Sequence, residues 1–175
     1  EPVHDLLKRP GVVQVACFIL LFKLGDLAIG PMVRPFWLDQ GLTTTQIGLI
    51  TGSIGVLAGI AGGLAGGVFI TRHGIYRGIW VLGLLQSVSN LSYSFVAGYP
   101  WFGAYGIYMA SFLESFCGGL GTSAFLAFLM SVCKKEFSAT QYALLSALFR
   151  ISGTIAASSS GWVTQDIGYA YYFTW

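Results

Sequence analysis

Four charged side chains interrupt long apolar stretches of this 175-residue chain. Lys23 and Asp26 are three residues apart, so on a helix they lie on one face and can form an ion pair. Glu114 and Arg150 each lie inside an apolar run of their own. A charge at the centre of a membrane costs about 2.5–3.5 kcal/mol or more, so such residues pair with one another or line a path for polar solutes. Two interpretations therefore stay open: ion pairs that hold helices together, and groups that bind a substrate or exchange a proton.

The two carboxylates are candidates for proton coupling. Removal from water disfavours the charged form of a carboxylate, and a nearby cation opposes that effect, so Asp26 and Glu114 are suited to gain and lose a proton. Gly118 and Gly121 follow Glu114 at helical spacing, which leaves room beside its carboxylate for a ligand or for another helix.

Two amide side chains form a polar patch in another apolar run. Gln86 and Asn90 are four residues apart and therefore share a helix face. Hydrogen bonds between helices are one role for such a patch, and binding of a polar solute is the other.

The chain shows no arrangement typical of catalysis or of metal binding. Ser158, Ser159 and Ser160 have no His or Asp close by in the sequence, and His4 and His73 lie outside the apolar runs without metal-ligand spacing. The glycine-rich segments lie inside apolar stretches rather than between a strand and a helix, which argues against a phosphate-binding loop. We therefore expect no enzyme, no cofactor and no metal.

The composition is that of a membrane protein. Hydrophobic residues make up 55% of the chain and charged residues only 9%, whereas soluble domains carry roughly 25% charged residues. This excludes a soluble enzyme and predicts an all-α membrane protein surrounded by lipid. The net charge of +2, with no run of more than two basic residues, gives no support for a nucleic-acid partner.

Runs of about 20 mostly apolar residues are long enough to cross a membrane as helices. The chain contains five complete runs and the start of a sixth. We place them at residues 12–33, 45–70, 78–96, 102–132 and 139–162, with the sixth beginning near residue 169. Ser138 and Gln141 have the spacing of a capping box, which predicts the start of the fifth helix.

Basic residues occur at every second end of these runs. They are Lys8 and Arg9, then Arg72 and Arg77, then Lys134 and Lys135, whereas the opposite ends carry Arg34 alone. Lys and Arg concentrate on the cytoplasmic side of membrane proteins. We therefore expect residue 1 and the turns at residues 72–77 and 133–138 to lie in the cytoplasm.

Glycines recur every three or four residues along the second expected span. This spacing puts them on one helix face, where a neighbouring backbone can approach closely. The positions that we assign to helix packing are Gly52, Gly55 and Gly59, together with Gly118 and Gly121 of the fourth span. A smooth face that permits rocking between two states is the functional alternative.

The segment Gly67-Val-Phe-Ile-Thr71-Arg72-His73-Gly74-Ile75-Tyr76-Arg77 resembles the cytoplasmic signature of the major facilitator superfamily. The matching positions, Gly67, Arg72, Gly74 and Arg77, form the expected cytoplasmic gate motif. Thr71 stands where that signature usually has an acid, which puts the charge relay assigned to the acid in doubt.

Longer stretches are similar to the AmpG-type muropeptide permeases. They read GIYRGIWVLGLLQSVSNLSYSFVA (residues 74–97) and ESFCGGLGTSAFLAFLMSVCKKEFSATQYALLSAL (residues 114–148). This resemblance implies the C-terminal six-helix half of a twelve-helix facilitator, with helices seven to eleven and the start of the twelfth. Because the chain begins at Glu1 and stops at Trp175 within an aromatic run, we expect a longer protein whose N-terminal half is this chain's partner.

The resemblance further implies a bacterial inner-membrane permease that imports anhydromuropeptides, the sugar–peptide fragments of cell-wall turnover, together with protons. Such a solute carries carboxylates, amides and hydroxyls, which cations and amide side chains can bind. The expected substrate and proton pathway comprises Lys23, Asp26, Gln86, Asn90, Glu114 and Arg150. Arg150 stands a little earlier than the family's usual basic residue. A facilitator for acetyl-CoA, for a drug or for another anionic metabolite, and a membrane sensor that transports nothing, remain as alternatives.

Overall fold

Helices make up almost the whole of the computed structural model, which describes residue 8, residues 11–99 and residues 103–167. In chain order they are α2 (Val12–Phe22), α3 (Leu24–Asp39), α4 (Thr44–Leu49), the π-helical turn η1 (Ile50–Ile54), α5 (Gly55–His73), α6 (Ile75–Gly98), α7 (Gly103–Val132), the 3-10 turn η3 (Lys135–Phe137) and α8 (Ser138–Ile167). No strand occurs within the described ranges, and the expected all-α class is confirmed.

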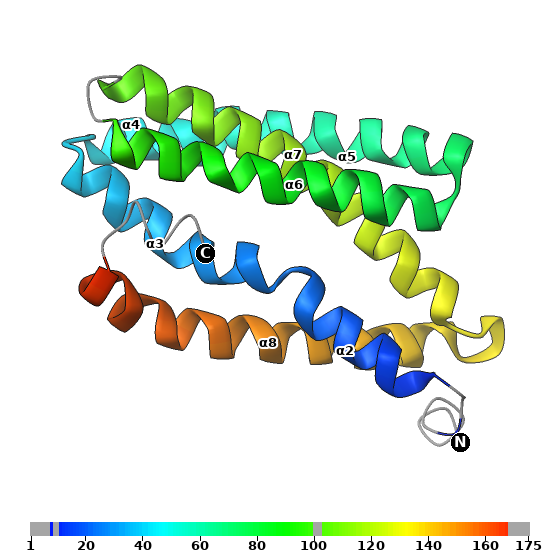
Figure 1. Ribbon diagram of the computed structural model, residues 1–175. Helices are drawn as coiled ribbons and strands as arrows, with labels where there is room; N and C mark the ends of the chain where they lie inside the picture. The colour runs from blue at the N-terminus through cyan, green and yellow to red at the C-terminus, as the bar shows by residue number, and fades with distance from the viewer. Residues whose placement is uncertain (1–7, 9–10, 100–102, 168–175) are drawn as a thin grey trace.

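The helices form two layers (Figure 1). In one layer α7 packs against both α5 and α6, and in the other α8 lies alongside α2 and α3. Buried apolar side chains join the layers. Trp37 of α3 belongs to one core cluster with Tyr93 of α6, and Ile19 of α2 belongs to another with Phe125 of α7.

Among the described residues, four stretches are long and apolar enough to cross a membrane: Val12–Asp39, Thr44–His73, Ile75–Gly98 and Gly103–Val132. They match the first four expected spans and establish a multi-pass membrane protein. Helix α8 covers the fifth expected span and has 30 residues, but its many serines and threonines leave it less apolar than these four. That α8 crosses the membrane stays a prediction, and the expected sixth helix lies outside the described residues.

The first expected span is longer than the apolar run predicts and is not one regular helix. It continues to Asp39 rather than ending near residue 33, although Pro31 and Pro35 lie inside α3. The chain turns only at Gly41, whose φ of 82° is left-handed. Within the span, α2 and α3 are separated at Lys23, whose φ of −111° and ψ of 13° are not helical.

Close contact between α5 and α7 depends on glycines. A methyl group added at Gly62 would overlap the carbonyl oxygen of Phe116, and one added at Gly119 would overlap the carbonyl oxygen of Gly59. Gly55 likewise lies against Ser115, so the expected packing face is present along α5.

The remaining glycines assigned to packing differ in their surroundings. Gly121 lies against the side chain of Gln86, and a Cβ at Gly118 would meet only Glu114, whose Oε1 lies 3.8 Å away. Gly52, within η1, faces open space. The packing face of α5 therefore begins at Gly55.

The basic turns lie together at one end of the bundle. Figure 1 shows the start of α2, the α5–α6 turn and the α7–α8 turn at this end, while the α3–α4 turn lies at the other. Arg72, Arg77, Lys134 and Lys135 are exposed there. This geometry agrees with the alternation of basic residues in the sequence.

Candidate functional site

The break between α2 and α3 places Lys23 in the middle of a 28-residue membrane stretch. Its backbone still accepts a 3.0 Å hydrogen bond from the N–H of Leu27, which begins the ladder of α3. Interrupted membrane helices are common at the binding sites of transporters, where irregular backbone lies beside polar groups. The sequence signal for this break is weak, since Gly25 is the nearest helix-disfavouring residue.

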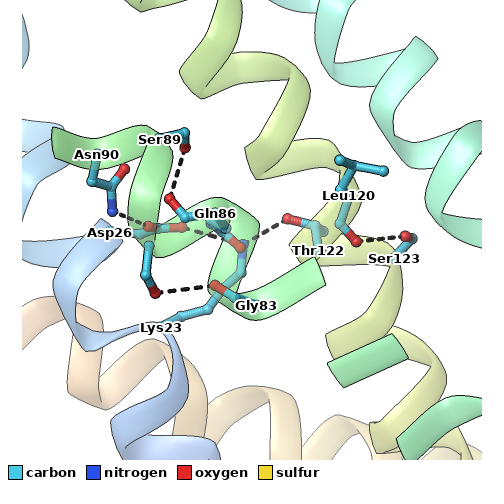
Figure 2. A network of polar contacts seen from close by, with 10 residues as sticks. Lys23, Asp26, Gly83, Gln86, Ser89, Asn90, Leu120, Thr122 and Ser123 are labelled. Carbon is cyan, nitrogen blue, oxygen red and sulfur yellow. Dashed lines mark hydrogen bonds and ion pairs between the residues drawn. The ribbon is translucent and has the colours of Figure 1, made fainter. Parts of the chain in front are cut away.

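Lys23 belongs to a polar cluster with Asp26, Asn90 and Thr122 (Figure 2). Its Nζ donates a 2.7 Å hydrogen bond to Oγ1 of Thr122 and lies 3.6 Å from Oδ2 of Asp26. The amide of Asn90 donates a 2.7 Å hydrogen bond to the other oxygen, Oδ1 of Asp26. The side chains of Lys23 and Asp26 are only 11% and 18% exposed. The cluster therefore joins α3, α6 and α7 through largely buried charges.

Glu114 lies on α7, two helical turns before Thr122, and interacts electrostatically with both Lys23 and Asp26. The structure thus brings the expected ion pair and the isolated carboxylate of α7 together. Gly118 leaves space beside the Glu114 carboxylate, as the spacing predicts. Lys23 therefore pairs with Asp26 and lies within electrostatic range of Glu114, and one negative charge is in excess when all three groups are ionised.

Gln86 is buried one turn away from Asn90 on α6 and is 5% exposed. Its side chain fits against α7 because Gly121 has no side chain. No described residue accepts a hydrogen bond from its Nε2 atom. A buried amide that lacks a partner costs about 1–3 kcal/mol, so Gln86 leaves an unsatisfied donor where α6 meets α7.

Arg150 does not join the polar cluster. It is exposed on α8, and among the described residues its side chain makes no hydrogen bond or ion pair with the cluster. Of the six residues expected in the pathway, five lie at the α2–α3 break and on α3, α6 and α7, whereas Arg150 makes no contact with the cluster.

Glu114 also lines a cavity of about 360 Å³ that is open to solvent and is bounded by residues of α3, η1, α5, α6 and α7. We call it the α3–α7 cavity. Its polar lining residues are Arg34, Trp37, Thr51, Tyr93, Ser111, Glu114 and Ser115.

Trp37, Tyr93 and Ser111 line the cavity, although the sequence pattern does not predict them as site residues. The hydroxyl of Tyr93 donates to Oγ of Ser111 over 3.3 Å, and Ser111 donates to the carbonyl of Ile107 over 2.7 Å. Tyr93 and Ser111 could not be paired from spacing, because they lie on different helices. Trp37 lies beyond the expected end of its span, although its spacing of three from Arg34 predicts a shared helix face.

The residues of the expected gate motif form the turn between α5 and α6. Gly74 has a φ of 86° and ψ of 160°, a conformation that a residue with a Cβ rarely adopts. Its N–H donates a 2.8 Å hydrogen bond to the carbonyl of Ile70. Thr71, which stands in place of the acid, donates to the carbonyl of Gly67 over 2.8 Å. The threonine hydroxyl is therefore bonded within its own helix, beside the exposed Arg72.

Comparison with known proteins supports the resemblance seen in the sequence. No family model matches the chain. The anhydromuropeptide permease of Escherichia coli (strain K12) is 34% identical over 173 residues, which are 98% of this chain and 35% of the permease. Putative transporter AmpG 4 of Rickettsia conorii is 30% identical over 174 residues, 99% of this chain and 42% of that protein. An uncharacterized protein of Haemophilus influenzae is 30% identical over 187 residues, 98% of this chain and 43% of that protein.

These relatives are much longer than the chain, which spans between a third and a half of their lengths. Two of the three are named permease or transporter. The likeness extends over almost all of this chain and agrees with the motifs at residues 74–97 and 114–148. The chain is therefore a homologue of the AmpG-type permeases over nearly its whole length.

Proposed function

We propose that this chain is the C-terminal six-helix half of a twelve-helix facilitator that imports anhydromuropeptides with protons across the bacterial inner membrane. The observation that carries the proposal is the polar cluster: Lys23 pairs with Asp26, within electrostatic range of Glu114, inside a membrane-spanning bundle. Buried charges in membrane helices are costly and mark solute or proton paths. The name of the Escherichia coli relative supports the substrate class.

The N-terminal half of the same protein is the proposed partner. Alternating access in this type of transporter requires two halves that rock about a site near the membrane centre. The chain spans 35% of the Escherichia coli permease, which leaves ample length for a second bundle. The exposed basic residues at the α5–α6 and α7–α8 turns support a cytoplasmic location for that end of the bundle.

We assign the exchangeable proton to Glu114. Asp26 already accepts a hydrogen bond from Asn90 and pairs with Lys23, contacts that suit its ionised form. Glu114 lines the α3–α7 cavity, from which a proton and a solute can both reach it. One proton on this carboxylate removes the excess negative charge beside Lys23. Proton uptake and solute binding then act on the same group, and no step requires covalent catalysis or a cofactor.

The test is uptake of labelled anhydromuropeptide by cells that express the full-length protein, with and without a protonophore. We expect uptake to collapse when the proton gradient is dissipated. Glu114→Gln keeps the size of the side chain but cannot exchange a proton. Uptake at equal protein level should therefore fall by about a hundredfold or more, since one positioned proton-transfer group contributes about 10²–10⁴-fold. Glu136→Gln, in the exposed α7–α8 turn, is the matched control and should transport normally.

Two outcomes would contradict the proposal. Normal, protonophore-sensitive uptake by Glu114→Gln would exclude Glu114 as the residue that carries the exchangeable proton. No uptake by well-expressed wild-type protein would remove the muropeptide assignment, and competition with acetyl-CoA and other anionic metabolites would then identify the solute.

A further inference from the structure

Arg34 is the basic residue that departs from the charge pattern of the chain. The turns at the basic end of the bundle carry Arg72, Arg77, Lys134 and Lys135, whereas Arg34 lies near the other end of the Val12–Asp39 stretch, close to the α3–α4 turn. A charged side chain within a membrane span is costly and marks a path or a binding site for polar groups. Arg34 is therefore a candidate for a role in binding.

The side chain of Arg34 has no partner within the described part of the chain. It forms no ion pair there and no hydrogen bond, and it is exposed where it lines the α3–α7 cavity. A guanidinium group is always charged, and it has five N–H donors and no acceptor. Its requirement for oxygen acceptors is thus left to a ligand.

The other polar groups of the cavity are less available to a ligand. The hydroxyls of Thr51, Tyr93 and Ser111 each donate to an oxygen atom of the protein itself. The indole nitrogen of Trp37 is buried, out of reach of a solute. Arg34 is therefore the cationic donor that the cavity presents to a solute.

Gly30 leaves open space beside Arg34. It lies one turn earlier on the same face of α3 and also lines the cavity, and a Cβ added there would meet no atom within 4 Å. Because the cavity is open to solvent, one end of a long solute can enter while the rest stays outside. The planar guanidinium fork matches the two oxygens of a carboxylate. We propose that Arg34 binds a carboxylate group of the solute in the α3–α7 cavity.

The charges of this region link such binding to a proton. Lys23 and Arg34 are positive and Asp26 and Glu114 are negative when ionised, so the four charges sum to zero. A bound carboxylate adds one negative charge, and a proton on Glu114, which lines the same cavity, restores neutrality. The carboxylate and the proton therefore raise each other's affinity by the same factor. The titratable groups that also interact with Glu114 are neutral and leave this sum unchanged: Tyr93 and Cys117.

The inference rests on the proposed function for the identity of the solute, so the experiment measures binding separately from uptake. Calorimetry on purified full-length protein gives the Kd of an anhydromuropeptide and of its derivative in which every carboxylate is converted to a carboxamide. We expect the wild-type protein to bind the carboxylate form about tenfold more tightly, the size of one charged contact.

Arg34→Gln removes the charge of an exposed side chain and leaves the packed core intact. It should weaken binding of the carboxylate form about tenfold and leave the Kd of the carboxamide form unchanged. Lys135→Gln, which removes one positive charge from the exposed α7–α8 turn, is the matched control and should bind both forms as the wild type does. Glu114→Gln is neutral without a proton, so it should bind the carboxylate form at least as tightly as the wild type although its uptake is lost.

A ratio of the two Kd values that is the same in Arg34→Gln and in the wild type would overturn the inference, even if uptake is normal. Weaker binding of the carboxylate form by Glu114→Gln would contradict the link between the carboxylate and the proton. Conversely, a preference for the carboxylate form that disappears in Arg34→Gln, in a wild-type protein that takes up no anhydromuropeptide, would support the carboxylate site and contradict the proposed transport.

Discussion

The side-chain amide of Asn90 donates a 2.7 Å hydrogen bond to Oδ1 of Asp26, across 64 residues of sequence. This hydrogen bond connects α6 to the charged face of α3, in addition to the apolar packing of Trp37 against α6. The Nζ atom of Lys23 lies 3.6 Å from the other carboxylate oxygen, Oδ2 of Asp26, so the carboxylate has a partner on each oxygen. The position of the ion pair therefore depends on a helix that carries no charge of its own inside the membrane.

Replacement of Asn90 tests this dependence. Asn90→Ala leaves one oxygen of a largely buried carboxylate without its donor, and we expect the free energy of unfolding to fall by about 1–3 kcal/mol. The measurement is denaturation of the full-length protein in detergent. Ser87→Ala is the control on the same helix, because the exposed Ser87 hydroxyl bonds only to the carbonyl of Gly83; its effect should stay within about 0.5 kcal/mol. Equal effects of the two variants would contradict the role of Asn90.

Composition and spacing predict the parts of this structure that depend on neighbouring residues in the chain. The length of the apolar runs predicts four of the helices that can cross a membrane, and the spacing of three predicts the pairing of Lys23 with Asp26. The glycines on one face of α5 predict the close contact with α7. Each of these inferences uses one helix at a time.

Contacts between helices could not be predicted in the same way. The pairing of Asn90 with Asp26, and that of Lys23 with Thr122, requires α6 and α7 to lie beside α3. Thr43 and Gln46 form a capping box at the start of α4, and the side-chain oxygen of Gln141 accepts a hydrogen bond from the backbone N–H of Lys134. Local spacing identifies residues that can cap a helix, and the path of the chain into the helix selects which backbone group they bind.

The glycine contact between α5 and α7 offers a pair of adjacent positions for a stability test. A Cβ at Gly62 overlaps the carbonyl oxygen of Phe116, whereas a Cβ at Gly63 would lie 4.0 Å from the nearest atom, the carbonyl oxygen of Gly119. Gly62→Ala should therefore force the helices apart and lower the free energy of unfolding by about 1–3 kcal/mol. Gly63→Ala should be neutral or stabilise by up to about 1 kcal/mol through helix propensity.

Denaturation of both variants of the full-length protein under the same conditions provides the comparison. Because the two substitutions are chemically identical, the difference between them reports the contact with α7 alone. A Gly63→Ala variant that is as unstable as Gly62→Ala would contradict the assignment of Gly62, rather than Gly63, to the face of α5 that packs against α7.

Arg72 and Arg77 of the gate motif should affect the rate of transport and not the folding of the protein. Both side chains are exposed at the end of the bundle, on either side of Gly74, so their removal leaves the packed core intact. If they form contacts with the N-terminal half in one state of the transporter, Arg72→Ala and Arg77→Ala should each lower the initial rate of anhydromuropeptide uptake severalfold. The amount of protein in the membrane should not change. Lys135→Ala, in the other basic turn, is the control and should transport at the normal rate. Wild-type uptake by both arginine variants would exclude the gate, because a contact that controls a conformational change cannot be lost without a change in rate.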